Sequence, residues 1–373
     1  MTDLRCEKST SLTAQEKHAF TKHLEEQALS SSVWDLFGEW VRRSTPQVNF
    51  FYLKAFADGN LVGIGLFVEL NPFDLRSSYS ALRRHPVIIK LAGGLSTLAR
   101  TRVCVGFRNL ITANLTRPFF YRELRSGELV MKALLAAVRD DPTFDMVTIV
   151  DTASHDRLYA EAGFRKFSSA SEAYLDVTKY RAISEYLAEH RSLKKNLRRK
   201  RKAVKTHVKR GPVSAAQIAQ LRDCVECSVE HSRVNNPCQR FFEENIFATE
   251  VYHSDKYIHV LVYVEDTIAG FHTFQVCGSH LGGVLGGFNR KYSRNNFLYE
   301  RVIVGSLEFA IKHHISRVHY SLVDNLTKMR LIDSLEPCGL YFWSTSALKR
   351  KLFEFTYRYS DVHELSLLEE RQS

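Results

Sequence analysis

The spacing of apolar and polar positions changes along the chain, and one order of patterns occurs twice. Apolar runs on either side of a short polar turn predict a β-hairpin around residues 58–60 and another around 265–267. After each hairpin, a segment with helical spacing, near 124–139 and near 298–313, leads to a short apolar strand. The repeated order predicts that the chain consists of two structurally similar halves.

The offsets between matching positions indicate an insertion in the first half. Gly63 and Gly270 are 207 residues apart, whereas the starts of the two helices are only 174 residues apart. Residues 71–101 account for the difference, and this segment is rich in Arg and contains Pro72 and Pro86. Its pattern leaves three interpretations open: a helical lid over a substrate site, a peripheral membrane contact, or a dimer contact.

The predicted elements extend over almost the whole chain. Thr13 and Glu16 have the spacing of a capping box, which predicts the start of the first helix. Helices are expected at 13–43, 124–139, 154–162, 213–233, 239–249, 297–314, 326–335 and 348–359. Strands are expected at 49–57, 61–69, 103–113, 146–150, 165–176, 257–264, 268–276, 280–288, 317–323 and 339–346. This order predicts the α/β (α+β) class, with mixed sheets covered by helices.

The positive charge is concentrated between the two halves. Residues 191–210 contain eleven of the 52 Lys and Arg residues and no acid, so the other basic residues equal the 41 acidic ones in number. One helix is predicted to run through this segment and to end at Gly211-Pro212. It is expected to carry an apolar stripe made of Ile183, Tyr186, His190, Leu193, Leu197, Val204 and Val208.

Two interpretations of this basic segment remain open. It is either a solvated connecting helix or a surface that binds a polyanion, such as tRNA, a nucleotide diphosphate or an anionic membrane face. The candidate anion-binding residues are Lys194, Lys195, Arg198 and Arg199. No aromatic residue lies between Ser192 and Arg210, so base stacking is not predicted.

Composition narrows the class of protein. A chain of 373 residues with 45% hydrophobic residues suits two mid-sized domains. No apolar run reaches the ~18 residues that cross a bilayer, and the first residues lack the apolar core of a signal peptide. Seven scattered cysteines predict reduced thiols in a cytoplasmic protein. Cys224, Cys227 and His231 are more typical of helix packing than of a metal site, and no metal is predicted.

Short motifs in both halves resemble those of one family. Residues 158–164, Leu-Tyr-Ala-Glu-Ala-Gly-Phe, resemble the closing motif of GNAT acyltransferases, in which a helix holding a Tyr ends at Gly-Phe before the next strand. Residues 186–199, the Gly-Gly-Phe at 286–288, and Lys328 ahead of Gly339 are similar to the tandem-GNAT group. That group comprises the FemABX peptidyltransferases and the related FemAB-like (BioF2-like) acetyltransferases.

The resemblance implies an architecture and a reaction. The architecture is two tandem GNAT-like domains, at 1–180 and 212–373, joined by a basic helical connector at 181–211. The reaction is transfer of an acetyl, longer acyl or aminoacyl group to an amine of a small metabolite or of a cell-wall-type precursor. The alternative is a non-catalytic tandem-GNAT scaffold, or an anion- or RNA-binding protein that uses the connector.

The acyl donor implied by the resemblance is acyl-CoA, with aminoacyl-tRNA as the alternative. GNAT enzymes that use acyl-CoA often have an Arg/Gln-x-x-Gly-x-Gly/Ala loop, and neither 120–127 nor 289–296 has this pattern. The second loop is nonetheless cationic and polar. It is expected to bind a phosphate or carboxylate of the substrate through Arg290, Lys291, Tyr292 and Arg294.

The candidate catalytic residues follow the two short apolar strands. In the family pattern a Lys at the place of Lys328 faces the reacting carbonyl, which implies oxyanion stabilisation; the alternative is a surface Lys. Asp324 and Asn325 could orient or deprotonate the acceptor amine, or could simply cap a helix. Tyr159 matches the GNAT tyrosine that protonates the leaving thiolate, with a core Tyr as the alternative. Substrate contacts are also expected from Tyr299 and Glu300, although Glu in a first helical turn is common.

Overall fold

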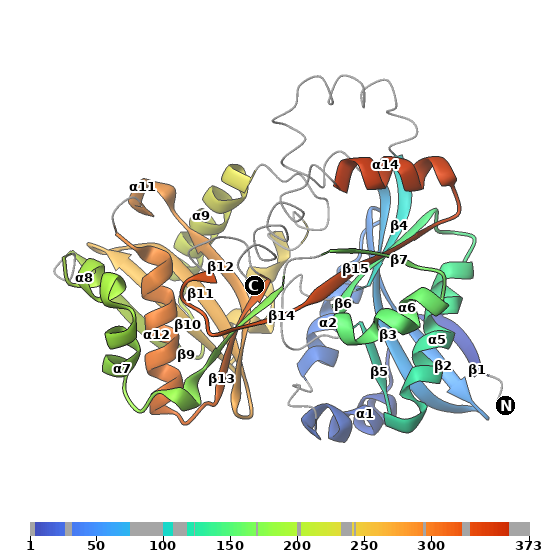
Figure 1. Cartoon of the computed structure of the whole chain (residues 1–373), viewed down its shortest axis with the longest axis horizontal. Coiled ribbons are helices and arrows are strands. Elements are labelled where there is room, and N and C mark those ends of the chain that lie inside the picture. The colour runs from blue at the N-terminus through green and yellow to red at the C-terminus, as the bar shows by residue number, and fades with distance from the viewer. Residues whose placement is uncertain are drawn as a thin grey trace.

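The computed structural model describes residues 4–26, 32–74, 100–106, 118–122, 124–168, 171–199, 203–232, 241, 244–293, 296–322 and 329–357. Two mixed β-sheets lie side by side, with helices outside and between them (Figure 1). Most of the insert at 71–101 lies outside the described residues, so its three interpretations stay predictions. Within the described ranges, no helix is both long and apolar enough to span a bilayer.

The first sheet is formed mainly by the N-terminal half. Its order is β1 (Leu4–Ser9), β2 (Val48–Ala57), β3 (Asn60–Asp74), β4 (Arg100–Gly106), β6 (Met146–Thr152), β15 (Cys338–Ser344) and β7 (Arg165–Ser168). The short strand β5 (Phe119–Tyr121) pairs with β3. All neighbours are antiparallel except β4 and β6, which are parallel.

The second sheet repeats this arrangement. Its order is β9 (Val204–Arg210), β10 (Tyr257–Val264), β11 (Thr267–Cys277), β12 (His280–Phe288), β13 (Arg317–Leu322), β8 (Glu172–Asp176) and β14 (Ser334–Glu336). Here β12 and β13 form the parallel pair, at the same place in the sheet as β4 and β6.

The two halves exchange their last strands. Strand β15, near the C-terminus, lies between β6 and β7 of the first sheet, and β8, from the first half, pairs with β13 and β14 of the second. The single strand expected at 165–176 is therefore wrong: it is two strands, β7 and β8, in different sheets. The predicted domain boundaries at 180 and 211 stay a prediction. They divide the sequence, whereas each sheet contains strands from both sides of these boundaries.

The hairpins confirm the repeat residue by residue. In the first half, Ala55 is opposite Gly63, and the register then shifts at the next residue. Val262 is opposite Gly270, and the register shifts at the same point. These pairs are 207 residues apart. The turns also match, because Asp58 and Glu265 both have a positive φ, 50° and 56°.

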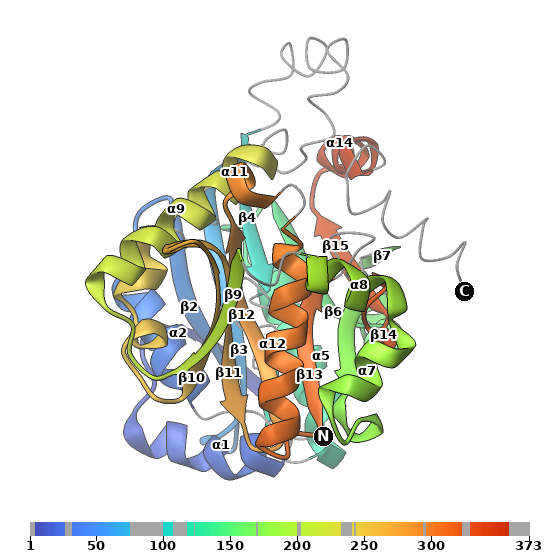
Figure 2. The ribbon, with the colours of Figure 1, turned by 90° about the vertical axis from the view of Figure 1, so that its left-hand side faces the viewer.

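Three apolar clusters hold the layers together. Helices α5 (Leu124–Asp140) and α6 (Asp156–Glu161) pack on the outer face of the first sheet. Helices α7 (Ile183–Glu189), α8 (Arg191–Arg199) and α12 (Leu298–Lys312) cover the outer face of the second sheet (Figure 2). The third cluster lies between the sheets and combines α1 (Ala14–Glu26), α2 (Ser32–Arg42), α9 (Ala215–Ser232) and α14 (Ala347–Tyr357).

The central cluster joins the two halves directly. The ring of Phe241 lies 5.6 Å from that of Trp40 and 5.3 Å from that of Phe50, measured between centroids. Arg43 also donates a hydrogen bond to Asn245 at 3.4 Å. The sheets are thus not independent units that only share a linker.

The connector is helical at its start and extended at its end. α7 and α8 are helices, as expected, and Tyr186 and Leu193 of the predicted stripe are buried. The expected helix does not continue through 204–210, which form β9 on the edge of the second sheet. Val204 and Val208 therefore do not share a helical face, and Val208 is exposed. Alternation of apolar and polar residues in Val-Lys-Thr-His-Val-Lys-Arg was the signal for a strand.

The closing segments of the two halves differ. Gly163, with φ 83°, follows α6 and ends it, as predicted. Gly339, by contrast, lies within β15 and closes no helix. The helix expected at 326–335 is also wrong at its end, since 334–336 form β14. The short helix expected at 239–249 is helical at the described residues 241, 244 and 245 and continues as the 3₁₀ turn Ile246–Ala248. A second 3₁₀ turn, Glu250–Tyr252, follows it.

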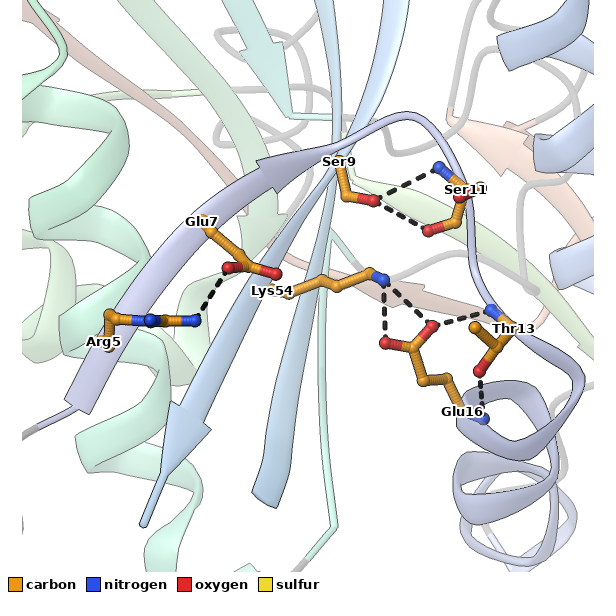
Figure 3. Close-up of polar contacts among 7 residues, drawn as sticks. All are labelled: Arg5, Glu7, Ser9, Ser11, Thr13, Glu16 and Lys54. Atoms are coloured by element: carbon orange, nitrogen blue, oxygen red, sulfur yellow. Dashed lines mark hydrogen bonds and ion pairs between the residues drawn. The ribbon is translucent and has the colours of Figure 1, made fainter. Parts of the chain in front are cut away.

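The predicted capping box at the start of α1 is confirmed. The backbone N–H of Thr13 donates to Glu16 Oε2 at 2.7 Å, and that of Glu16 donates to Thr13 Oγ1 at 3.2 Å. Lys54 of β2 adds two bonds from Nζ to the Glu16 carboxylate, at 2.7 and 2.9 Å (Figure 3). One carboxylate therefore fixes α1 against the first sheet.

Candidate functional site

In each sheet, the described residues of the parallel strand pair are joined near one end. β12 and β13 pair at three positions, from His280 opposite Arg317 to Gly282 opposite His319. Among the residues that the structure describes, which end at Leu322 on this side, the two strands do not pair beyond that point, although β12 runs on to Phe288. Unpaired backbone groups on such an edge need other partners. The divergence of the strands therefore offers a place for an extended ligand in the second sheet.

A histidine that sequence reasoning missed lies at this point of divergence. A Cβ on Gly283 would be 2.9 Å from His272 Nε2 and 2.9 Å from the carbonyl oxygen of His319. A Cβ on Gly286 would be 2.9 Å from His272 Nδ1. The glycines of β12 thus make room for the imidazole of His272 on β11. The two Gly-Gly pairs in the sequence, at 282–283 and 286–287, were the available signal.

Three of the expected substrate-binding residues lie just after β12. Arg290, Lys291 and Tyr292 form the one-turn helix α11 (Arg290–Ser293), and both cations are exposed. Lys291 Nζ lies 5.3 Å from the centre of the Tyr292 ring. Arg294 lies outside the described residues. A positively charged turn therefore precedes α12, as the sequence indicated.

Tyr299 and Glu300, two further residues expected to contact the substrate, lie in the first turn of α12. The Tyr299 ring packs against Phe288, 5.7 Å between centroids, which places it at the end of β12. Burial raises the pKa of the Glu300 carboxyl above its usual value. Both residues thus adjoin the divergent end of the strand pair.

A buried arginine connects the basic connector to this region. Arg301 Nε donates to the carbonyl oxygen of Asn296 at 3.1 Å, and Nη2 donates to that of Leu197 at 3.2 Å. Burial lowers the pKa of Arg301 from its usual value. The bonds hold the end of α8 beside the loop that precedes α12. No sequence pattern indicated this contact, because Arg301 lies among residues with ordinary helical spacing.

The cations of α8 differ from those of the first half. Lys194, Lys195 and Arg198 have no carboxylate of the described residues within 4.0 Å. The side chain of Arg199 lies outside the described part. Cations of the first half are commonly paired, as in Lys132–Glu161, Lys166–Asp156, Arg157–Glu128, Lys17–Asp35 and Arg102–Glu69. The positive charge of α8 is therefore not neutralised by described acidic groups.

A pocket of about 400 Å³ lies along the edge strand of the second sheet. Lys205, His207 and Lys209 project from one face of β9 into it, and Tyr263 and Gln217 also line it. Gln217 accepts a hydrogen bond from Lys209 Nζ at 3.1 Å and donates one to the Tyr263 hydroxyl at 3.1 Å. Glu265 and Asp266 line the same pocket, so the two lysines of β9 share it with two acidic side chains.

Tyr159 of the first half is completely buried. Its ring stacks on that of Tyr341, 3.6 Å between centroids with an interplanar angle of 4°. Its hydroxyl donates to Asp151 Oδ2 at 3.1 Å. The same oxygen accepts a bond of 2.8 Å at His155 Nδ1. Tyr159 is thus part of a polar cluster beneath α6, and its expected role as an acid stays a prediction.

Three predicted catalytic positions cannot be placed. Lys328, Asp324 and Asn325 all lie in 323–328, outside the described residues. This segment follows β13, which ends at Leu322. Among the described residues there is no group of three or more His, Cys, Asp or Glu that could hold a metal ion. Cys224 lies buried on α9, where burial raises the pKa of its thiol to about 12.

Comparison with known proteins supports the architecture. No family model and no curated protein matches the chain. The solved structure of FemX has a TM-score of 0.55 and 12% identity, covering 94% of this chain and 99% of that one. L-PGS from Bacillus licheniformis has a TM-score of 0.52 and 14% identity, covering 93% and 95%.

A third solved structure is itself that of a tandem GNAT protein. A tandem GNAT protein from the clavulanic acid biosynthesis pathway has a TM-score of 0.51 and 11% identity, covering 91% of this chain and 98% of that one. At these identities the likeness concerns the fold. Each match covers more than nine-tenths of both chains, so it includes both sheets. The chain therefore has the tandem GNAT fold shared by these structures.

Proposed function

We propose that the protein is a GNAT-like N-acyltransferase. It transfers an acetyl, longer acyl or aminoacyl group from an activated donor to an amine of a small metabolite or of a cell-wall-type precursor. The amine nitrogen attacks the acyl carbon, the new C–N bond forms, and the bond to the leaving group breaks. A base takes the proton of the amine, and the leaving group receives a proton from an acid or from solvent.

The divergence of β12 and β13 is the observation that carries this proposal. Among the described residues β12 pairs with β13 only as far as Gly282, so an extended donor containing amide groups can add along the edge from Gly283 to Gly287. The backbone of Phe288, the last residue of β12, is already bonded to Ser228 Oγ. The first turn of α12 and the cations of α11 are close to the end of this strand. A helix N-terminus and cationic side chains favour a phosphate. These features suit acyl-CoA, and aminoacyl-tRNA is the variant.

The proposed catalytic groups come from the segment that follows β13. Lys328 would donate to the oxyanion that forms on the acyl carbonyl, and such a donor is worth about 10²–10³ in rate. Asp324 and Asn325 would orient the amine and take its proton. Tyr159 lies in the first half, far from these residues along the chain, and it is fully buried. Its burial supports a role in holding the first half together more than a role as a proton donor.

A donor screen with matched lysine variants tests the proposal. Purified protein is incubated with acyl-CoA, and separately with charged tRNA, each with a panel of amines. We expect turnover with one donor, and a loss of about 100-fold or more in kcat for Lys328→Ala. Lys312→Ala, an exposed lysine at the end of α12, is the control and should retain full activity. Equal turnover of wild type and Lys328→Ala would contradict the assigned role, and no turnover with either donor would contradict the function.

The unpaired cations favour a second candidate, a protein that binds a polyanion through its connector. Lys195 and Arg198 are exposed and unpaired among the described residues. Phosphate contacts of this kind are independent of sequence and weaken with salt. Binding without turnover would favour this candidate over the enzyme.

Charge-reversal variants test the contribution of the connector. Binding to single-stranded RNA is measured between 50 and 200 mM salt for Lys195→Glu with Arg198→Glu. We expect the slope of log K against log salt to fall by about 0.7 for each phosphate that the variant no longer neutralises. Lys312→Glu with Lys351→Glu changes the net charge equally at exposed positions elsewhere. If both double variants lower the slope equally, the effect is due to net charge and not to a site on α8.

A further inference from the structure

The structure assigns a proton-transfer pair to the first half: His155 as a general base and Asp151 as the residue that positions it. Asp151 lies near the end of β6, and His155 follows four residues later, in the 3₁₀ turn Ala153–His155. This inference rests on the proposed acyl transfer and adds a second proton acceptor, in the first half, to the one proposed at Asp324 in the second half. It places that group in the half of the chain where the sequence singled out Tyr159.

The carboxylate of Asp151 is buried and surrounded by donors. Only 1% of the residue is exposed. Its Oδ1 accepts the backbone N–H of Thr152 at 2.8 Å, and its Oδ2 accepts bonds from the Tyr159 hydroxyl at 3.1 Å and from His155 Nδ1 at 2.8 Å. A buried carboxylate without such donors is strongly unfavourable. The arrangement therefore keeps Asp151 as an acceptor, which requires the Nδ1 of His155 to carry a proton.

The bond at Nδ1 determines what the other ring nitrogen can do. When Nδ1–H donates to a carboxylate, the neutral imidazole has Nε2 as an acceptor. The His155 side chain is 23% exposed, and the described residues place no hydrogen-bond partner on Nε2. Nε2 is thus reachable and able to accept a proton. The carboxylate also stabilises the imidazolium that forms when it does so.

The exchanged strand β15 supports this pair from the other half of the chain. Tyr341 stacks on Tyr159, and its hydroxyl donates to the carbonyl oxygen of Thr152 at 3.2 Å and to Asp156. Gly339 lies opposite Asp151 in the sheet. A Cβ on Gly339 would be 2.6 Å from the Tyr341 ring and hydroxyl, so glycine leaves the space that this ring occupies. The pair is therefore complete only when β15 is inserted.

The location corresponds to the proposed site of the second half. Among the described residues, β4 and β6 pair from Val103 opposite Met146 to Val105 opposite Thr148, and Asp151 lies beyond the last of these positions. In the second half, Asp324 and Lys328 have the same spacing of four residues after the matching strand. In the sequence, each half thus has an acid and a basic residue four positions apart after the second strand of its parallel pair.

The proposed step is a balanced proton transfer. A ligand amine or hydroxyl near the ends of β4 and β6 attacks the acyl carbon. Its proton moves to Nε2 of His155 as the bond to the acyl carbon forms. The leaving group departs with the bonding electrons, and the imidazolium then returns the proton to the leaving group or to water. Asp151 remains ionised throughout.

Two measurements test the pair without knowledge of the natural substrate. Long-range ¹H–¹⁵N NMR reports which ring nitrogen of neutral His155 is protonated, and we expect Nδ1. Hydrolysis of p-nitrophenyl acetate, whose ester C–O bond breaks to release p-nitrophenolate, reports base function at Nε2. His155→Gln keeps a donor for Asp151 but has no imidazole, and we expect its kcat to fall about 10²-fold or more with little change in KM. Asp151→Asn should lower kcat by about 10-fold or more and reduce the Nδ1–H form.

Matched tyrosine variants separate positioning from folding. Tyr159→Phe removes a donor to Asp151 but leaves the carboxylate that accepts from His155 Nδ1–H, so we expect the wild-type tautomer of His155 and a lower kcat. Tyr341→Phe keeps the stacked ring and removes only bonds to Thr152 and Asp156. The tautomer of His155 in this variant should be that of wild type. If His155→Gln folds and keeps full hydrolysis, or if neutral His155 carries its proton on Nε2, the inference is wrong. Hydrolysis that depends on His155, without transfer from acyl-CoA or charged tRNA, would keep the pair and overturn the proposed transferase instead.

Discussion

At the scale of single residues, one carboxylate links a sequence motif to the tertiary structure. The capping box of Thr13 and Glu16 could be predicted because both partners are three residues apart. The bonds from Lys54 could not, because they join residues 38 positions apart in different elements. Burial alone would raise the pKa of Glu16, but the bonds from Lys54 and Thr13 outweigh it and hold this pKa below its usual value.

This lowered pKa makes stability depend on pH. A carboxyl whose pKa is lower in the folded state contributes stability above its unfolded value, near 4.3, and loses it as the pH falls through the folded value. We expect Glu16→Gln to lower the free energy of unfolding by about 2 kcal/mol at pH 7. The difference from wild type should shrink as the pH falls below about 4, and urea unfolding at several pH values would measure it.

The neighbouring pair in Figure 3 supplies the control. Arg5 and Glu7 form an ion pair of 3.0 Å, but their side chains are 77% and 44% exposed. Exposed pairs contribute about 0–1 kcal/mol, so Glu7→Gln should change stability little at any pH. A loss in Glu16→Gln that stays constant down to pH 2 would show that the carboxylate charge is not responsible.

The residues of the candidate sites were accessible to sequence reasoning only in part. The sequence could single out the residues around the start of the helix expected at 297–314. The cationic loop before it contains Arg290 and Lys291, and its first turn contains Tyr299 and Glu300. Asp151 could be matched to Asp324 by its offset after a strand. His155 could not be recognised, because nothing in a 3₁₀ turn fixes where its ring points until Tyr159 and the strand β15 are in place.

At the scale of elements, the strands were predictable where pairing is local. Both hairpins follow from apolar runs around a turn, and the structure confirms them with matching register shifts. Edge strands were harder. β1 and β9 are short and mostly polar, since an edge strand has one solvated side, and the many cations of 204–210 favoured a helical interpretation. Their pairing partners lie about 50 residues away along the chain, beyond the reach of a local pattern.

The segment at 165–176 shows a second limit of sequence patterns. Three positions, 169–171, separate β7 from β8, and the Ser-Ser-Ala-Ser run at 168–171 was the available signal for a break. Nothing in the segment indicates which sheet each strand joins. The two strands belong to different sheets because β15 occupies the place beside β7. Competition among strands for a place in a sheet is a property of the whole chain, so a window of twelve residues cannot reveal it.

At the scale of the whole molecule, the exchange of strands predicts one cooperative unfolding transition. The β15 strand is central in the first sheet, and the apolar cluster between the sheets contains residues of both halves. We expect Leu340→Pro in β15 to destabilise the protein by about 3 kcal/mol or more, because proline removes a ladder bond. Hydrogen exchange should then speed up in β6 and β13 together, and circular dichroism should still show a single transition.

An exposed position near β15 supplies the matched variant. Leu348 is 52% exposed in the first turn of α14, where proline is tolerated. Leu348→Pro should therefore unfold at nearly the same urea concentration as wild type. Two separate transitions in Leu340→Pro, with β13 still protected, would instead show that the halves unfold independently.

The exchanged strand also determines when the first half can be finished during synthesis. Residues 338–344 leave the ribosome long after β6 and β7, and at 5–20 residues per second this delay is on the order of 10–40 s. Until then the two strands have an empty place between them, with backbone groups that invite pairing with another chain. The nascent protein should therefore be most vulnerable to aggregation, and most in need of a chaperone, just before its last strand emerges.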